Sequence, residues 1–290
     1  MVRLCNTFFL FLLPCLSVIK VFVQSKTAKD KIANAKDCLL FTGLVSAVSA
    51  AFLAALFLRS LPTATELIFA AIYALCSVGF QFFYVLAFKN GPLSVTSTVT
   101  SFAVVIRIVF GTVYYHTKIG VFGYVSFALI ALAFLLIPDR KKGKGKKANA
   151  SWIVFTLLAF LFSGANSAAQ VVVSKTEGCN VNTVVVISYL FSAALCLSAT
   201  LLFLRQKITL RPEKSLLFGI PIIAISLGLY NLLSVITLKD VPETVFYTVV
   251  PGIHLALVNV VGIVFMKEKK TALQIVGMIL AVLAVILIHF

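Results

Sequence analysis

The chain has 290 residues, of which 61% are hydrophobic and only 12% charged, and its mean hydropathy is +1.09. Soluble domains carry about 25% charged residues. A cytosolic enzyme, a disordered region and a secreted disulfide scaffold are excluded, because none of them keeps so much apolar surface away from water. The formal charge of +16 lies in short basic clusters between apolar runs, which is typical of loops that contact anionic lipid head groups rather than nucleic acid. The composition predicts an integral membrane protein.

Ten apolar stretches are long enough to cross a hydrocarbon core of about 30 Å as helices of roughly 20 residues. They span residues 5–23, 38–58, 67–88, 93–115, 119–137, 152–173, 183–204, 215–238, 245–266 and 271–290. The runs are continuously apolar, whereas barrel strands alternate and are about half as long, so the predicted fold class is all-α. A cleaved signal peptide is an alternative for the first stretch, but no small-x-small cleavage site follows it, and Pro14 and Lys20 interrupt it.

A polar linker rich in Gly and Lys at 138–149 separates two halves, 1–137 and 150–290, with five stretches each. A shift of 150 residues aligns Lys89 with Lys239 and Pro92 with Pro242, within LAFKNGPLSV and ITLKDVPETV. This common offset favours an internal duplication. Because each half has an odd number of helices, the copies would enter the membrane in opposite senses, as in many secondary transporters. We therefore predict ten transmembrane helices arranged as two inverted five-helix repeats.

This layout resembles the drug/metabolite transporter superfamily, and in particular its EamA-type permeases. The shared features are a lysine-containing turn after the third helix (LAFKNGP, LKDVP), a fourth helix rich in hydroxyl residues (SVTSTVTSF) and a charged turn, MKEKKTALQIVG, before the last helix. The resemblance implies a permease of a bacterial plasma membrane that moves amino acids or related metabolites without ATP or another cofactor. The first half departs from it, with YHTKIG where family members usually carry an acidic residue; the second half keeps Glu268.

The basic residues predict an orientation. Eighteen Lys and Arg residues lie in odd-numbered connections, whereas five lie in even-numbered connections and at the termini. The positive-inside rule then places the odd connections in the cytoplasm and both termini outside. The resemblance implies cytoplasmic termini instead, and the two orientations both stay open.

Arg107 is the most conspicuous polar residue within a stretch, because an unpaired charge near the middle of a membrane helix costs on the order of 3 kcal/mol. All nine acidic residues fall in predicted loops or at helix ends, so proton-for-cation exchange on an embedded carboxylate is not expected. Arg107 would pair with an anionic group of the substrate; alternatively, backbone carbonyls hold it or it snorkels along a tilted helix. Thr96, Thr100, Arg107 and Gly111 recur at helical spacing, which predicts a polar stripe.

A site between two repeats should draw on equivalent positions in both. Two polar pairs meet this condition, Gln81 with Asn231 and Lys20 with Gln170, although Lys20 could also snorkel from the end of its stretch. Tyr84, Tyr230 and Asn166 lie beside these residues in the helical register. His254 lies near Pro251, where a kink would free carbonyls for a ligand, but such a histidine is also commonly an interhelical hydrogen-bonding group. Asn259, on another face, is expected to bond between helices.

These observations predict a secondary transporter, a monomer or homodimer, for a small polar metabolite. The predicted substrate-binding residues are Arg107, His254, Gln81, Tyr84, Asn231, Tyr230, Gln170 and Asn166. No catalytic or metal site is expected, because the chain contains no HExxH, GxSxG or P-loop motif. A sugar-phosphate or nucleotide-sugar exchanger of the same superfamily is one alternative, and a multi-pass lipid-handling enzyme or scramblase is another.

Overall fold

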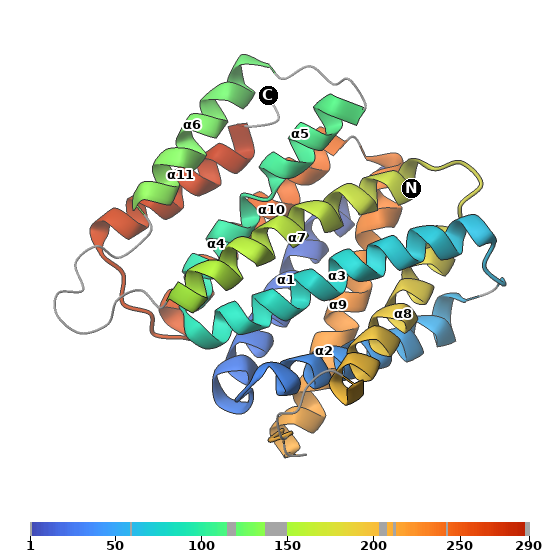
Figure 1. The fold of residues 1–290 in the computed structure, drawn as a ribbon. Coiled ribbons are helices and arrows are strands. Elements are labelled where there is room, and N and C mark those ends of the chain that lie inside the picture. The colour runs from blue at the N-terminus through green and yellow to red at the C-terminus, as the bar shows by residue number, and fades with distance from the viewer. Residues whose placement is uncertain are drawn as a thin grey trace.

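The computed structural model describes residues 2–58, 60–114, 120–136, 150–202, 208–210, 213–241 and 243–287. All regular elements within these residues are α-helices (Figure 1). They are α1 (Val2–Lys31), α2 (Ala35–Phe57), α3 (Ala64–Asn90), α4 (Leu93–Ser101), α5 (Val104–Tyr114), α6 (Val121–Leu136), α7 (Ala150–Lys175), α8 (Val181–Leu202), α9 (Lys214–Asp240), α10 (Glu243–Val264) and α11 (Ala272–Leu287). The all-α prediction is confirmed.

Six of these helices, α1, α2, α3, α7, α8 and α9, are long and apolar enough to cross a membrane. In the remaining predicted stretches, the described residues form shorter apolar helical segments: Leu93–Ile106, Val121–Ile130, Val249–Val264 and Ala272–Ala284. Most of the chain therefore consists of apolar helices whose exposure to water would be unfavourable. The protein is accordingly described as an integral membrane protein with several spanning helices.

The fourth predicted stretch is not one helix, and this part of the prediction is wrong. Helix α4 ends at Ser101 and α5 begins at Val104. The hydroxyls of Thr98 and Ser101 donate to the carbonyls of Ser94 and Ser97, four residues earlier, a type of bond that bends helices. At the break, the backbone N–H groups bond to carbonyls three residues earlier, which tightens the turn. The predicted stripe from Thr96 to Gly111 assumed one continuous helix; its second part, Arg107 and Gly111, lies outside the described side chains.

The first helix is longer than its apolar stretch. The sequence after residue 23 is polar and suggests a loop, but α1 continues to Lys31. Four residues of this extension, Gln24, Ser25, Thr27 and Ala28, are buried, because α1 packs against α9 and α10. This extension changes the depth of Lys20, which lies well inside the helix and not near its end.

Contacts between the two halves occur in matched sets. Helix α1 packs on α9 and α3 packs on α7, while α2 packs on α8, α4 on α10 and α6 on α11. Helices α3 and α9 have 27 residues each, and their first residues, Ala64 and Lys214, differ by the offset that aligns the sequence with itself. The halves thus interlock along the whole bundle.

Side-chain contacts fix which connections share an end of the bundle. Asp37, after the α1–α2 connection, accepts hydrogen bonds from the backbone N–H groups of Thr209 and Leu210 in the α8–α9 connection. The carboxylate of Glu268, between α10 and α11, accepts from Leu93 at the start of α4. Lys89 near the end of α3 donates to the carbonyl of Ala33. We call the end formed by these four connections the basic end.

At the opposite end, the α2–α3 connection meets the α7–α8 connection. Glu66 forms a capping box with Thr63 at the start of α3, and its other carboxylate oxygen accepts from the backbone N–H of Asn180 at 2.7 Å. Helix α1 therefore runs toward the basic end, whereas α7 runs away from it. The first helices of the two halves have opposite directions.

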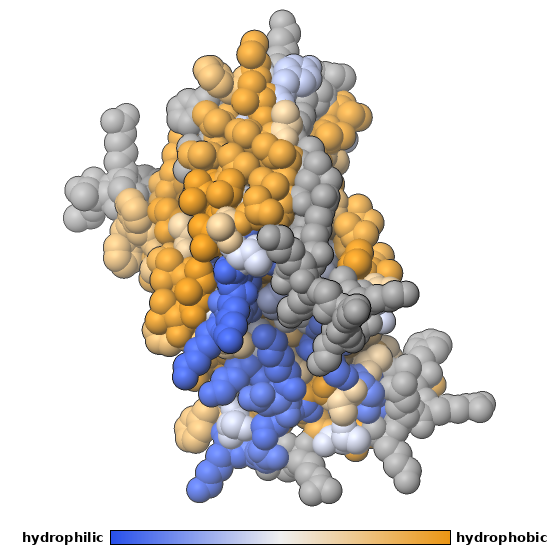
Figure 2. Space-filling model, turned by 90° about the vertical axis from the view of Figure 1, so that its left-hand side faces the viewer, coloured by the Kyte–Doolittle hydropathy of each residue, from blue (hydrophilic) through white to orange (hydrophobic). Residues whose placement is uncertain are grey.

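The surface of the bundle is divided between apolar and polar zones. Figure 2 shows hydrophobic residues covering the upper part of one side and hydrophilic residues gathered below them. The α6–α11 pair contributes exposed apolar side chains, among them Phe122, Leu132, Ile279 and Leu283. Large exposed apolar surfaces of this kind mark contact with a membrane or a partner, and here they belong to helices of an integral membrane protein.

Candidate functional site

A cavity of about 130 Å³ lies between the two halves. Four of the helices that line it, α1, α3, α4 and α5, come from the first half, and three, α7, α9 and α10, come from the second. The break after α4 contributes directly, because Thr100, Ser101, Ala103 and Val104 all line the cavity. The break between α4 and α5 therefore places hydroxyl groups and a tight backbone turn in the wall of the cavity.

Seven of the eight predicted site residues line this one cavity. They are Gln81, Tyr84, Asn166, Gln170, Tyr230, Asn231 and His254. Pro251, the suggested kink position, also lines it, within the uninterrupted helix α10. The repeat offset explains why residues from distant parts of the sequence come together, since it pairs Gln81 with Asn231 across the two halves. Their proximity is a fact of the structure, whereas their role in binding stays a prediction.

Arg107, the eighth predicted residue, belongs to helix α5, but its side chain lies outside the described part of the structure. The side chain of Glu243, an acidic residue that the sequence places at a helix end, also lies outside the described part. The role of Arg107 therefore stays a prediction from the sequence.

Lys20 is the residue that the sequence placed least well. It is only 5% exposed, it lines the cavity, and its ammonium lies 5.6 Å and 5.8 Å from the ring centres of Phe80 and Tyr84. The alternative that Lys20 snorkels from the end of its stretch does not hold, because α1 continues to Lys31 and Lys20 is buried. Its offset pairing with Gln170 was the signal that could have identified it, and the same offset relates Phe80 to Tyr230 and Ser17 to Ser167, all of which line the cavity.

A chain of hydrogen bonds holds one side of the cavity in place. The amide nitrogen of Gln170 lies 2.9 Å from the hydroxyl of Tyr73 and 3.1 Å from the Oδ1 atom of Asn231. Asn231 in turn donates to the hydroxyl of Tyr189, which donates to the carbonyl of Leu227. Polar groups buried in an apolar bundle need such partners. The network connects α3, α7, α8 and α9 and fixes the orientation of both amides.

Another part of the cavity wall is aromatic and hydroxylated. The ring of Phe80 stacks on Tyr84 at a centroid distance of 4.9 Å, and the Tyr84 hydroxyl lies 2.8 Å from the Ser97 hydroxyl. Gln81 accepts a hydrogen bond from Gln24 at 2.9 Å. Two polar atoms of cavity-lining residues, Asn166 Oδ1 and His254 Nδ1, are buried without a hydrogen-bond partner. The cavity thus combines one cation, aromatic faces and unpaired polar atoms.

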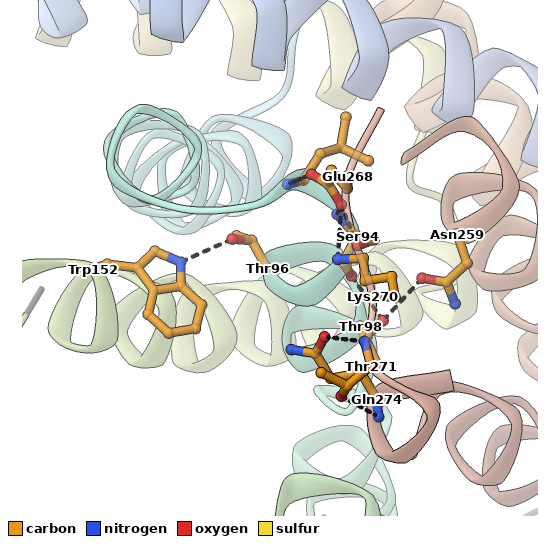
Figure 3. Close-up of polar contacts among 10 residues, drawn as sticks. Ser94, Thr96, Thr98, Trp152, Asn259, Glu268, Lys270, Thr271 and Gln274 are labelled. Atoms are coloured by element: carbon orange, nitrogen blue, oxygen red, sulfur yellow. Dashed lines mark hydrogen bonds and ion pairs between the residues drawn. The ribbon is translucent and has the colours of Figure 1, made fainter. Parts of the chain in front are cut away.

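Near the cavity, α4 is held by contacts to the second half (Figure 3). Thr98 lies 3.4 Å from Asn259 of α10, and the indole nitrogen of Trp152 in α7 donates to the Thr96 hydroxyl at 3.0 Å. The expected role of Asn259 as an interhelical hydrogen-bonding residue is confirmed. Helix α4 is therefore tied to two helices of the other half.

Glu268 caps α4 from the other half of the chain (Figure 3). Its carboxylate accepts from the backbone N–H groups of Leu93 and Ser94 and from the Ser94 hydroxyl, and Lys270 lies 2.9 Å away. Pro92 at the N-cap position supplies no side-chain hydrogen bond. Burial raises the pKa of Glu268, but the bonds from Ser94, Lys270 and Leu93 outweigh it and hold the pKa below its usual value. The negative charge also complements the N-terminal end of the helix dipole.

Comparison with known proteins identifies a fold but no family. No family model matches the chain, and no curated protein matches it. A solved structure described only as "Crystal structure of protein" is 16% identical, and the alignment covers 98% of this chain and 96% of that one with a TM-score of 0.62. At this identity the likeness shows the fold alone. Among the described residues, no three His, Cys, Asp or Glu side chains gather where they could hold a metal ion.

Proposed function

We propose that the protein is a secondary transporter of the drug/metabolite superfamily, similar to EamA-type permeases, that carries a small polar metabolite across a plasma membrane by alternating access. The observation that supports this most is the central cavity, which three helices of each half line with polar side chains. Transporters built from inverted repeats place the substrate at such an interface near the bilayer midplane.

The ten-helix inverted repeat belongs to the same proposal. Its support comes from the matched contacts, in which α1 on α9 has its counterpart in α7 on α3, and α2 on α8, α4 on α10 and α6 on α11 are their own counterparts. The opposite directions of α1 and α7 agree with inversion. In this arrangement α4 and α5 together form the fourth span, and the basic end contacts anionic lipid head groups.

Uptake into liposomes tests the function. The purified protein is reconstituted into liposomes that contain a mixture of unlabelled small metabolites. Counterflow is then measured with labelled amino acids, organic acids and sugar phosphates in the outer solution. We expect at least one compound to exchange without ATP. If no compound exchanges and labelled phospholipid moves between the leaflets, the protein is a scramblase and not a transporter.

A variant of the cavity makes this test specific. Asn166→Leu removes a cavity-lining amide whose Oδ1 atom has no protein partner, so it should lower exchange at least tenfold while leaving thermal stability nearly unchanged. Ser198→Leu, an exposed position on α8, is the matched control and should exchange normally. Normal exchange by the Asn166→Leu variant would show that the substrate does not pass through this cavity.

A further inference from the structure

Lys20 is a buried cation whose counter-charge the described residues do not supply. Its ammonium faces two aromatic rings, and no hydrogen bond or ion pair joins it to any described side chain. The carboxylates that link the two halves have other partners. Asp37, Glu66 and Glu268 accept hydrogen bonds from the backbone N–H groups of Thr209, Asn180 and Leu93, respectively. All three lie at the ends of helices, away from the middle of the bundle.

An ammonium group removed from water needs compensation. Aromatic faces supply part of it through the ring quadrupole, but a charge kept away from bulk water is normally paired with an opposite charge. Because Lys20 lines a cavity, a soluble anion in that cavity can provide the missing charge. The aromatic rings on the same wall would pack against the apolar part of such an anion.

The size of the cavity limits the anion. A protein cavity of about 150 Å³ accepts benzene, a molecule of about six non-hydrogen atoms, and the cavity here measures about 130 Å³. Among the described residues that line the cavity, Lys20 is the one Lys or Arg, and a single ammonium balances a single negative charge. The unpaired Oδ1 atom of Asn166 can accept a hydrogen bond from a hydroxyl group on the ligand. The unpaired Nδ1 atom of His254 can accept from such a hydroxyl or, when it carries the proton, donate to a hydroxyl or keto oxygen.

Charge also separates an anion from a zwitterion. Among the described residues that line the cavity there is no Asp or Glu. The ammonium of an amino acid would therefore enter a space that already holds the positive charge of Lys20 and no carboxylate to pair with it. A net monoanion fits these surroundings better than an amino acid of the same size.

We propose that Lys20 is the anion-binding residue of the cavity and that the transported substrate is a small monocarboxylate, such as a hydroxy or keto acid, of about six non-hydrogen atoms. The carboxylate pairs with Lys20. The hydroxyl of a hydroxy acid donates to Asn166 Oδ1 and accepts from His254 Nδ1, and the keto oxygen of a keto acid accepts from His254 Nδ1 alone. This inference rests on the proposed transport function and gives it a substrate class.

Ligand binding to the purified full-length protein tests the inference, because a ligand that binds only the folded state raises its unfolding temperature. The probes are L-lactate, its neutral isostere lactamide, the zwitterion L-alanine and inorganic phosphate. We expect L-lactate to bind at least tenfold more tightly than each of the others. Equal binding of lactamide would overturn the requirement for charge, and tighter binding of L-alanine or phosphate would overturn the substrate class. This comparison uses the unmodified protein and so does not depend on whether a variant folds.

Variants of α1 then assign the charge to Lys20. Lys20→Gln should weaken L-lactate binding at least tenfold, whereas Lys26→Gln, at an exposed position of the same helix, should leave it unchanged. Lys20→Arg keeps the charge and should retain part of the binding. Unchanged binding by a folded Lys20→Gln protein would overturn the assignment.

Transport distinguishes failure of this inference from failure of the proposed function. Exchange of a neutral or cationic compound that Lys20→Gln leaves intact would preserve the transporter and reject the anion site. Absence of exchange and of binding for all solutes tested would reject both.

Discussion

At the scale of single residues, carboxylates hold the ends of this bundle together while the middle carries a lone buried amine among the described residues. Glu268 is the clearest case, because one side chain from the second half caps a helix of the first. Its side chain is only 8% exposed, although it lies in a connection. A surface carboxylate in a loop would contribute little, whereas this one satisfies backbone N–H groups that have no partner within α4.

Replacing Glu268 by Gln should destabilise the protein by about 1–2 kcal/mol at neutral pH, the usual effect of losing a helix cap. The folded-state pKa is below the ordinary value of 4.5, so the stabilisation by the charge is present above that value and is lost as the pH falls through the folded-state pKa. The difference between wild type and variant should therefore shrink below pH 4.5. Thermal unfolding in detergent, followed by the loss of helical circular dichroism, measures it.

The control for this prediction is Glu177→Gln, at an exposed position between α7 and α8. It should not change stability at any of these pH values. A Glu268 variant as stable as wild type at pH 7 would show that the cap is not required to hold α4.

At the scale of helices, close approach between neighbours depends on glycine. A Cβ atom added to Gly164 in α7 would lie 2.5 Å from the Cβ atom of Ile106 in α5. Carbon atoms that are not bonded prefer separations of about 3.5–4.0 Å. The glycine therefore sets how near α5 can come to the second half, directly after the break that shapes the cavity.

Gly164→Ala should destabilise the protein by roughly 1–3 kcal/mol, the usual cost of overpacking, and should weaken ligand binding because α5 and the adjoining break must move. Gly219→Ala in α9 is the matched control, since its new Cβ atom would lie 3.7 Å from Val23. The control should be neutral or slightly stabilising, because Ala is favoured over Gly in a helix by about 1 kcal/mol. Equal unfolding temperatures for the two variants would contradict this view of the α5–α7 contact.

Apolar length predicted most helices of this fold, because the bilayer demands a run of similar length at each crossing. Hydropathy could not predict the interruption at Phe102, because the residues on both sides are equally apolar or hydroxylated and the break depends on where hydroxyls bond to the backbone. It could not predict the extension of α1 either. The polar residues Gln24 and Thr27 look like a loop in sequence. They are buried because other helices cover them: Gln24 donates to Gln81 of α3, and Thr27 lies beside Gly219 of α9.

The repeat predicts part of the candidate site, whereas His254 is predicted from its place beside Pro251. Gln81 and Asn231 are unremarkable alone, but their common offset selected both, and both line the cavity. Lys20 shares this signal through Gln170, but its place near the end of its apolar stretch leaves snorkelling open. The length of α1 decides between the two, since burial of a side chain depends on where the helix ends.

At the scale of the whole molecule, the links between the halves are distributed over both ends of the bundle. Asp37 and Glu268 join the halves at the basic end, and Glu66 joins them at the opposite end. The cavity lies between these ends. In a transporter of the proposed kind, opening toward one side requires that the links on that side break.

Weakening the links at one end should therefore open the cavity toward that end. A cysteine placed at Ser167, a cavity-lining position of α7, in a protein otherwise free of cysteine reports access to a membrane-impermeant thiol reagent. Combining Asp37→Asn with Glu268→Gln should raise the rate of labelling from the basic end roughly tenfold. A tenfold shift in population needs only about 1.4 kcal/mol, and a single hydrogen bond to a charged group contributes about 1.5–3 kcal/mol. Glu66→Gln should raise labelling from the opposite end instead, and Glu177→Gln should change neither rate. Vesicles of both orientations measure the two rates separately, and equal increases from both ends would show that the carboxylates stabilise the fold without controlling access.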